Sequence, residues 1–149
     1  MSKRNDVVDE MVTLLQAATT EHLAGLDDEA DISRGPVALG AVDDLEMGEK
    51  KVWLEVAGDD MTPATLDRDG HSMAVYVLVA MRSYDREDDM PTCIDLADEV
   101  ERAILSDRTL NGEVQEIHPM KFIPGYVTTD QDNFAIVQMQ FIMDFHTTD

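Results

Sequence analysis

The sequence predicts an α+β fold, in which two helices pack on one face of a mainly antiparallel sheet of four to five strands. Residues 73–84 carry apolar side chains at both sets of alternating positions, which is typical of a central strand covered on both faces. Residues 134–146 alternate between apolar and polar side chains, which predicts one buried face and one face open to water or to a partner. Between them, residues 91–106 carry apolar side chains at helical spacing, so we expect a helix there.

The first third of the chain predicts a helix, a connector and two strands. Apolar residues recur three and four positions apart over residues 6–24, which predicts an amphipathic helix. Residues 27–35 are acidic and contain few large apolar side chains, so we expect a surface connector. A short edge strand is predicted over residues 36–41. A further strand is predicted over residues 51–57, where apolar side chains alternate along one face.

Polar segments separate the next elements. Residues 58–70 contain Pro63 and the turn signal 67–70, which predicts a polar loop between two strands that pair as an extended hairpin. Residues 85–89 are predicted to form a charged loop. Pro91 is then expected in the first turn of the following helix, where a missing N–H costs nothing.

The dipeptide Asn111-Gly112 predicts a turn after that helix. A strand is predicted over residues 113–122, with Pro124 and Gly125 ending it. Residues 128–133 are predicted to form a second polar loop before the last strand.

The size and charge of the chain limit its class and its partners. A chain of 149 residues suits one domain with a sizeable core. A net charge of −21 repels nucleic acid and anionic membranes, and no apolar run approaches the length of a membrane span. Two explanations of the acidity stay open: a host with high internal salt, which the excess of Asp over Lys favours, or a surface for a basic partner.

No catalytic site, cofactor or metal ion is predicted. The four histidines lie in four different predicted elements, without the short spacing that places two metal ligands on one helix face. Phosphate-binding loops, dinucleotide-binding turns and nucleophile elbows are absent from the sequence. A set of carboxylates lies in polar segments, where such groups stay solvated. These are Asp43, Asp44, Glu46, Asp59 and Asp60.

The sulfur-containing residues are expected to fill the core. Cys93 is the single cysteine and sits on the predicted second helix, so we expect a small buried hydrophobe. Methionine is flexible and fills irregular gaps between helices and strands, although a methionine-rich partner groove is the alternative. The methionines at core-compatible positions are Met11, Met73, Met81, Met90, Met120, Met139 and Met143.

The second helix and the turn after it resemble a known family. Residues 96–104 read Leu-Ala-Asp-Glu-Val-Glu-Arg-Ala-Ile, and the run Thr-Leu-Asn-Gly follows at residues 109–112. Together with the order of the predicted elements from Asp6 to Phe145, this stretch resembles the tail-terminator proteins, a family of minor tail or tail-completion proteins of long-tailed bacterial or archaeal viruses. In that family, a helix of this type precedes a small turn and then a hairpin that ends the domain.

The resemblance implies a structural virion protein rather than an enzyme. Members form a hexameric ring on the head-proximal end of the tail tube, stop tube polymerisation and present a surface to the head connector. The implied partners are therefore further copies of the chain, the tail tube protein and a head-tail connector protein, in the neck of a virion assembled in the host cytoplasm. DNA would pass through such a ring without sequence-specific binding, which suits an acidic lumen.

The predicted contacts to neighbouring subunits or partners lie on three polar segments, 43–50, 58–70 and 128–133, and on the polar face of the last strand. The candidate contact residues are Asp43, Asp44, Glu46, Asp59, Asp60, Asp67, Arg68, Asp69, Thr128, Asp130, Gln138, Gln140 and Asp144.

Three other functions stay open on the sequence alone. Another neck or tail-completion subunit would share the size and the lack of chemical motifs. A small cytoplasmic ligand-binding or regulatory domain would use its sheet and helices to frame a pocket lined by methionines. An enzyme would need an activity carried by dispersed carboxylates, such as Asp59, Asp60 and Asp67.

Overall fold

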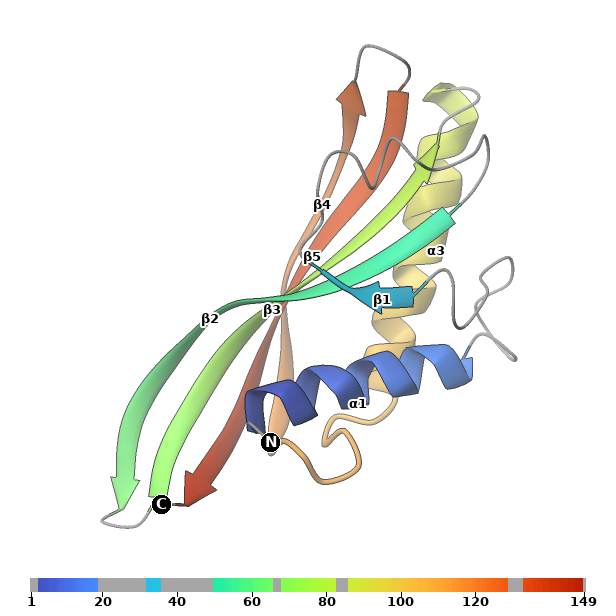
Figure 1. Ribbon diagram of the computed structural model, residues 1–149. Helices are drawn as coiled ribbons and strands as arrows, with labels where there is room; N and C mark the ends of the chain where they lie inside the picture. The colour runs from blue at the N-terminus through green and yellow to red at the C-terminus, as the bar shows by residue number, and fades with distance from the viewer. Residues whose placement is uncertain are drawn as a thin grey trace.

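A computed structural model describes residues 3–18, 32–35, 50–65, 68–82, 86–128 and 133–148 of the chain. Two helices and five strands form within these residues, and Figure 1 shows the helices beside a long, strongly twisted sheet. In chain order the elements are α1 (Lys3–Ala18), β1 (Ile32–Arg34), β2 (Lys50–Thr65), β3 (Arg68–Arg82), α3 (Arg86–Leu105), β4 (Glu116–Thr128) and β5 (Asn133–Thr148). Neither of the described helices is long and apolar enough to cross a membrane.

The described strands form one sheet in the order β1-β2-β3-β5-β4. β1 is parallel to β2, and the other three pairings are antiparallel. The predicted α+β class with a mainly antiparallel sheet is therefore confirmed. β3 lies in the middle of the sheet, as its apolar character predicts, and its pairing with β5 runs without interruption from Arg68 to Arg82.

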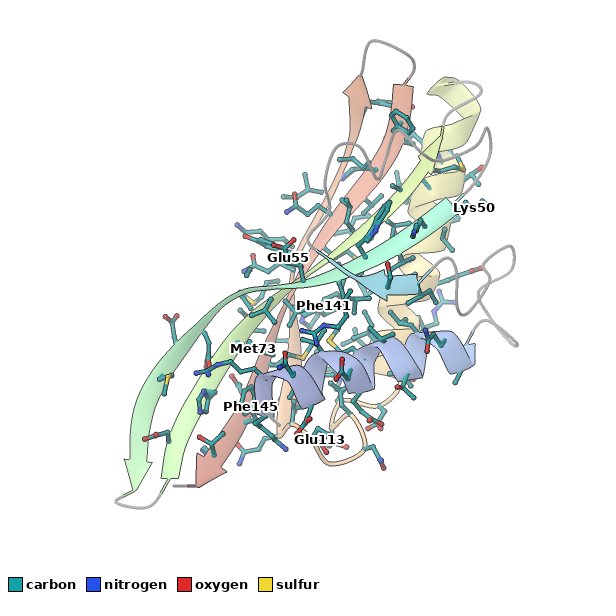
Figure 2. All side chains as sticks on the ribbon, viewed as in Figure 1. Lys50, Glu55, Met73, Glu113, Phe141 and Phe145 are labelled. Carbon is teal, nitrogen blue, oxygen red and sulfur yellow. The ribbon has the colours of Figure 1, made fainter. Side chains whose placement is uncertain are left out.

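The main core contains side chains of both helices and of the described strands. The odd-numbered side chains of β3 from His71 to Met81 and of β5 from Ala135 to Phe145 are fully or almost fully buried, and Met73, Phe141 and Phe145 are labelled in Figure 2. Val7 and Met11 of α1 and several residues of α3 belong to the same continuous cluster. Because apolar positions on α1 recur three and four residues apart, one side of this helix can be buried while Asp9 stays exposed.

Cys93 lies in this core, as predicted. Its thiol faces the backbone carbonyl groups of Val79 and Ala135, with Sγ to oxygen distances of 3.8 and 3.6 Å. Burial raises the pKa of the thiol to about 12. The side chain is therefore a protonated small hydrophobe at neutral pH.

The second face of β3 is covered in part, which corrects the prediction of a strand buried on both sides. Trp53, Ala80 and Phe134 form a small buried cluster at one end of this face. Farther along the strand, the side chain of Tyr76 is 36% exposed. The central strand is therefore apolar on both faces, although one of them remains open over the middle of the sheet.

β2 and β3 are much longer than the sequence predicts, and the predicted loop over residues 58–70 is wrong. β2 continues through Gly58 and Pro63 to Thr65, and β3 already begins at Arg68. Pairing with β3 supplies backbone hydrogen bonds that a polar segment cannot satisfy alone, and irregularities at Val56/Gly58 and Pro63/Thr65 absorb the unfavourable residues. The predicted antiparallel pairing of these two strands is present.

Three other boundaries also differ from the predictions. Residues 32–34 form a strand inside the predicted connector, because Ile32 is buried and pairs in parallel with Val52. The predicted strand over residues 36–41 lies outside the described residues. α3 begins at Arg86 instead of following a loop over residues 85–89, which places the exposed Pro91 inside the helix rather than in its first turn.

β4 begins later and ends later than predicted. It runs from residue 116 to residue 128, so Pro124 and Gly125 do not end it. Within the described sheet β4 pairs with β5 alone, and an edge strand tolerates proline because its outward N–H groups need no partner strand. Met120 sits at an irregularity in this pairing and is 58% exposed, so it is not the core residue that its position predicts.

The turn predicted at Asn111-Gly112 is confirmed. Leu110, Asn111 and Gly112 have φ values of 46°, 57° and 85°, a left-handed run that glycine and asparagine tolerate best. The carboxylate of Asp107 accepts hydrogen bonds from the backbone N–H groups of Thr109 and Asn111. These bonds, with that from Asn111 contributing most, hold the pKa of Asp107 below its ordinary value.

Candidate functional site

The open face of the sheet carries an ordered row of polar and aromatic side chains across four strands. The pairing places Glu55 of β2 beside Tyr76 of β3, Tyr76 beside Gln140 of β5, and Gln140 beside Lys121 of β4. Glu55 is labelled in Figure 2 on the side of the sheet away from α1. This row crosses the middle of the sheet, so its side chains can act together on one partner.

A second row runs next to the first and is more apolar. Leu78 of β3 pairs with Gln138 of β5, which pairs in turn with Ile123 of β4. Ile123 is 52% exposed although it is a large apolar residue. The two rows together line a shallow hollow of about 200 Å³ between β3, β5 and β4. We call the face of the sheet that carries these two rows the open face.

The far end of the open face is polar and acidic. Asp144 of β5 accepts a hydrogen bond from the hydroxyl group of Ser72 at 2.9 Å, and its other oxygen lies 2.9 Å from Nε2 of His118. The side chains of His118 and Asp144 are 47% and 35% exposed. Their contact is therefore screened by water and stabilises the fold weakly.

A buried polar cluster lies on the opposite face, where the sheet extends past the first turn of α1. The carboxylate oxygen Oδ2 of Asp59 accepts hydrogen bonds from Nδ1 of His71 at 2.7 Å and from Nε of Arg4 at 2.6 Å. Nε2 of His71 lies 2.7 Å from the hydroxyl oxygen of Thr147. The ring of His71 also stacks on Phe145, with ring centres 4.7 Å apart. We call these five residues the anchor cluster.

The anchor cluster joins four elements at one point, namely α1, β2, β3 and β5. The side chains of His71 and Asp59 are only 3% and 8% exposed, so their hydrogen bond is shielded from water. The other carboxylate oxygen of Asp59, Oδ1, is buried and has no hydrogen-bond partner in the described part of the chain. The cluster therefore fixes the direction in which the long strands leave the domain. The prediction that Asp59 is a solvated carboxylate is wrong, because its side chain is buried in this cluster.

The strand ends beyond this point form a projecting arm, which comprises residues 58–65 of β2 and 68–72 of β3 together with the end of β5 (Figure 1). Met61 lies on the arm and is 53% exposed. Sδ of Met61 lies 3.2 Å from Nη2 of Arg4, whose Nε binds Asp59. The arm is therefore tied to the start of α1 but presents apolar surface to the outside.

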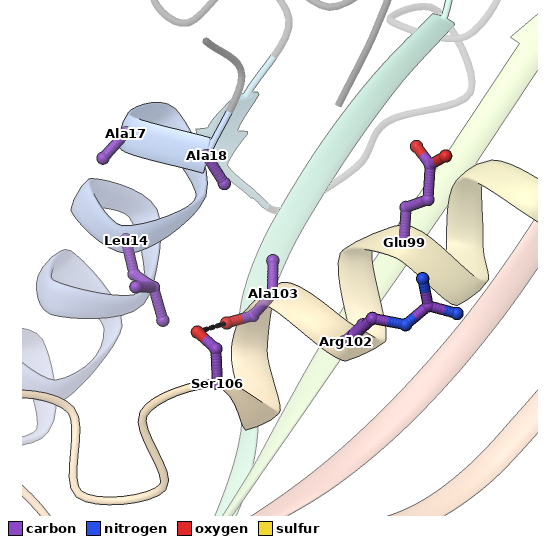
Figure 3. Close-up of a pocket in the computed structure, with 7 residues that line it drawn as sticks. All are labelled: Leu14, Ala17, Ala18, Glu99, Arg102, Ala103 and Ser106. Atoms are coloured by element: carbon purple, nitrogen blue, oxygen red, sulfur yellow. Dashed lines mark hydrogen bonds between the residues drawn. The ribbon is translucent and has the colours of Figure 1, made fainter. Parts of the chain in front are cut away.

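A groove lies between α1 and α3, near their C-terminal ends (Figure 3). It has a volume of about 660 Å³ and an apolar floor of small side chains and one leucine. Arg102, Glu99 and Ser106 form its polar rim, and the hydroxyl group of Ser106 donates a 2.6 Å hydrogen bond to the carbonyl of Ala103. No methionine is among its described lining residues, which is contrary to the methionine-lined pocket of the ligand-binding alternative.

The candidate contact residues fall in three groups. Gln138, Gln140 and Asp144 lie on the open face, and their side chains are partly exposed there. Strands rather than loops hold the second group: Asp59, Asp60, Arg68 and Asp69 lie on the strands of the arm, and Thr128 is the last residue of β4. Outside the described residues lie Asp43, Asp44, Glu46, Asp67 and Asp130.

Sequence reasoning missed the anchor cluster and the groove. Asp59 lies in a segment predicted as a loop, and His71 follows that loop twelve residues later, so nothing local indicated that they meet. The signal was the alternation itself: continuing the β3 pattern backwards from Met73 places His71 on the core face. Among the described residues, no group of three or more His, Cys, Asp or Glu side chains could hold a metal ion.

The fold is similar to that of a solved protein from a virus-like particle. No known protein family matches the sequence, and no curated protein matches it. A chain in the structure of the virion of a native gene transfer agent particle matches this fold with a TM-score of 0.51 and 14% sequence identity. The match covers 89% of this chain and 95% of that chain, so the likeness extends over most of both.

Proposed function

We propose that this protein is a structural component of a tailed, phage-like virion and that it acts in assembly rather than in catalysis. The observation that carries the proposal is the shared fold with a chain of a gene transfer agent virion, which extends over nearly the full length of both chains. The helix and turn that resemble the tail-terminator family, residues 96–112, support it independently because they were identified from the sequence.

Within the virion, the proposed role is that of a tail terminator. Copies of the chain form a ring, expected to be a hexamer, on the head-proximal end of the tail tube. The ring stops tube polymerisation and receives the head connector. An acidic chain suits this position, because a net charge of −21 disfavours binding to DNA that passes through the ring.

The open face offers a surface for these contacts. Tyr76 and Ile123 supply apolar area, and Gln138 and Gln140 supply hydrogen-bond donors and acceptors with no net charge. Interfaces are typically built from an aromatic or apolar centre with a polar rim. The composition of the open face is therefore that of a protein-binding surface. Lys121 adds one positive charge at its edge.

The nearest alternative is another neck or tail-completion subunit. Such a protein would share the fold and the ring, but it would bind a different partner. The experiment therefore has to measure tube capping itself and not only oligomer formation.

Tube capping can be measured with the tail tube protein of the same virion. We expect the purified chain to bind one end of growing tubes and to stop elongation, as observed by negative-stain microscopy of tube lengths. Tyr76→Arg, on the open face, should reduce capping, whereas Thr13→Arg, on an exposed position of α1, should not. Tubes that elongate normally in the presence of an assembled wild-type ring would refute the terminator role.

A further inference from the structure

We propose that the projecting arm of one copy docks into the groove between α1 and α3 of a second copy, with Met61 entering the groove and Asp69 pairing with Arg102. This inference rests on the proposed ring and identifies the contact that closes it. The arm lies at one end of the sheet, whereas the groove lies between the two helices (Figure 1), so the contact joins two different surfaces.

The arm presents an apolar side chain and a carboxylate on the same side. Met61 of β2 pairs with His71 of β3, and Pro63 pairs with Asp69, so Met61 and Asp69 are diagonal neighbours on one face. Met61 is 53% exposed, and Asp69 forms no ion pair within the described part of the chain. A methionine beside an unpaired acid is well suited to an apolar pocket with a basic rim.

The groove offers the complementary features. Leu14, Ala18 and Ala103 make an apolar floor, and the small alanines leave space for an unbranched side chain such as methionine. Arg102 and Glu99 lie close to one another on the rim (Figure 3), so the rim carries one basic and one acidic side chain beside the apolar floor.

Arg102 also differs from the other arginines whose side chains the structure describes. Arg4, Arg34 and Arg108 are each paired with a carboxylate at 2.6 to 3.1 Å. Within the described residues Arg102 forms no ion pair, although Glu99 and Asp98 lie within one helical turn. An incoming carboxylate could therefore bind this guanidinium without breaking an existing ion pair.

The geometry of the contact leads to a ring. A contact between two different surfaces of the same chain repeats from copy to copy, and it closes into a ring when the rotation between neighbours allows. Since every copy carries a net charge of −21, the contact has to overcome repulsion, and the pairing of Asp69 with Arg102 is a local attraction within that field. Association should therefore strengthen in high salt, which screens the long-range repulsion more than a close pair.

Cross-linking tests the contact directly. A chain that carries both Met61→Cys and Ala17→Cys, treated with a short bismaleimide in molar salt, should give a ladder of covalent multimers on a denaturing gel. The native Cys93 is buried and protonated, so it leaves no background. The matched control carries Met120→Cys and Ala17→Cys, in which the exposed methionine of β4 replaces that of the arm. We expect no ladder from this control.

Exchanging the charges of Asp69 and Arg102 is the second test of the contact. Arg102→Glu should raise the concentration at which half of the chains are assembled by about tenfold or more, and adding Asp69→Arg should restore assembly. A particle of the expected mass that gives no ladder, or gives equal ladders in both cysteine variants, would overturn the docking contact and leave the proposed ring intact. A chain that stays monomeric in molar salt would overturn both.

Discussion

The anchor cluster makes a strong prediction about stability. Asp59→Ala removes the acceptor of two hydrogen bonds, one from His71 at 2.7 Å and one from Arg4 at 2.6 Å. The buried Nδ1–H group of His71 would then lack a partner, which costs about 1–3 kcal/mol. The ion pair with Arg4 adds about 1 kcal/mol at most, because the Arg4 side chain is 42% exposed. The substitution also removes the buried Oδ1, which has no hydrogen-bond partner among the described residues, and this recovers part of the lost stability. We therefore expect the free energy of unfolding to fall by about 2–3 kcal/mol.

Urea unfolding at a fixed protein concentration measures this loss. The single tryptophan, Trp53, is 4% exposed and reports unfolding by its fluorescence. The matched control is Asp60→Ala, because the neighbouring carboxylate is exposed and its removal should change stability by no more than about 0.5 kcal/mol. If both variants unfold at the same urea concentration as the wild type, the anchor cluster does not hold the arm and the reasoning is wrong.

Three further predictions follow from single residues. Gly112→Ala should destabilise the fold by about 1 kcal/mol, because φ is 85° there, whereas Gly125→Ala should be nearly neutral; thermal unfolding separates the two, and equal effects would contradict the turn geometry. The Cys93 thiol should react with a chromogenic disulfide only at the rate of unfolding, and fast labelling of the native protein would disprove its burial. The pKa of Asp107 is lowered by folding, so its stabilising effect is complete above the unfolded pKa and is lost as pH falls through the folded pKa. Asp107→Asn should therefore lower stability at pH 7 and cease to matter at strongly acidic pH; an effect that persists there would contradict this role.

The central elements could be predicted from the sequence because their burial follows local periodicity. The alternation from Ala135 to Phe145 corresponds residue by residue to the buried face of β5. The spacing of Ala97, Val100 and Ile104 corresponds in the same way to the buried side of α3. These patterns need no knowledge of the partner element, since period two and period 3.6 are set by the strand and the helix themselves.

The long ends of β2 and β3 could not be predicted because a neighbouring strand stabilises them. Gly58, Asp60 and Pro63 have low intrinsic strand preference, and their local signal favours a turn. Pairing of β3 with β2 on one side and β5 on the other outweighs that preference. The three-residue strand at Ile32 is too short for any period to be visible.

The candidate site also contains residues that local periodicity predicts and residues that only the folded sheet brings together. Gln138 and Gln140 were assigned to a partner-facing surface because they alternate with buried residues, and they lie on the open face. Arg4, Asp59 and Thr147 come from distant parts of the sequence and meet only after the sheet has formed. Whether the open face binds a partner stays a prediction that capping experiments test.

The mass of the protein in solution tests the proposed ring most directly. Light scattering after size-exclusion chromatography, in molar salt and over a hundredfold range of concentration, gives this mass without a partner protein. We expect a species near six times the 16.6 kDa chain, and microscopy of the same fraction should show rings. A mass that stays at 16.6 kDa at every concentration would contradict the ring and, with it, the tail-terminator function.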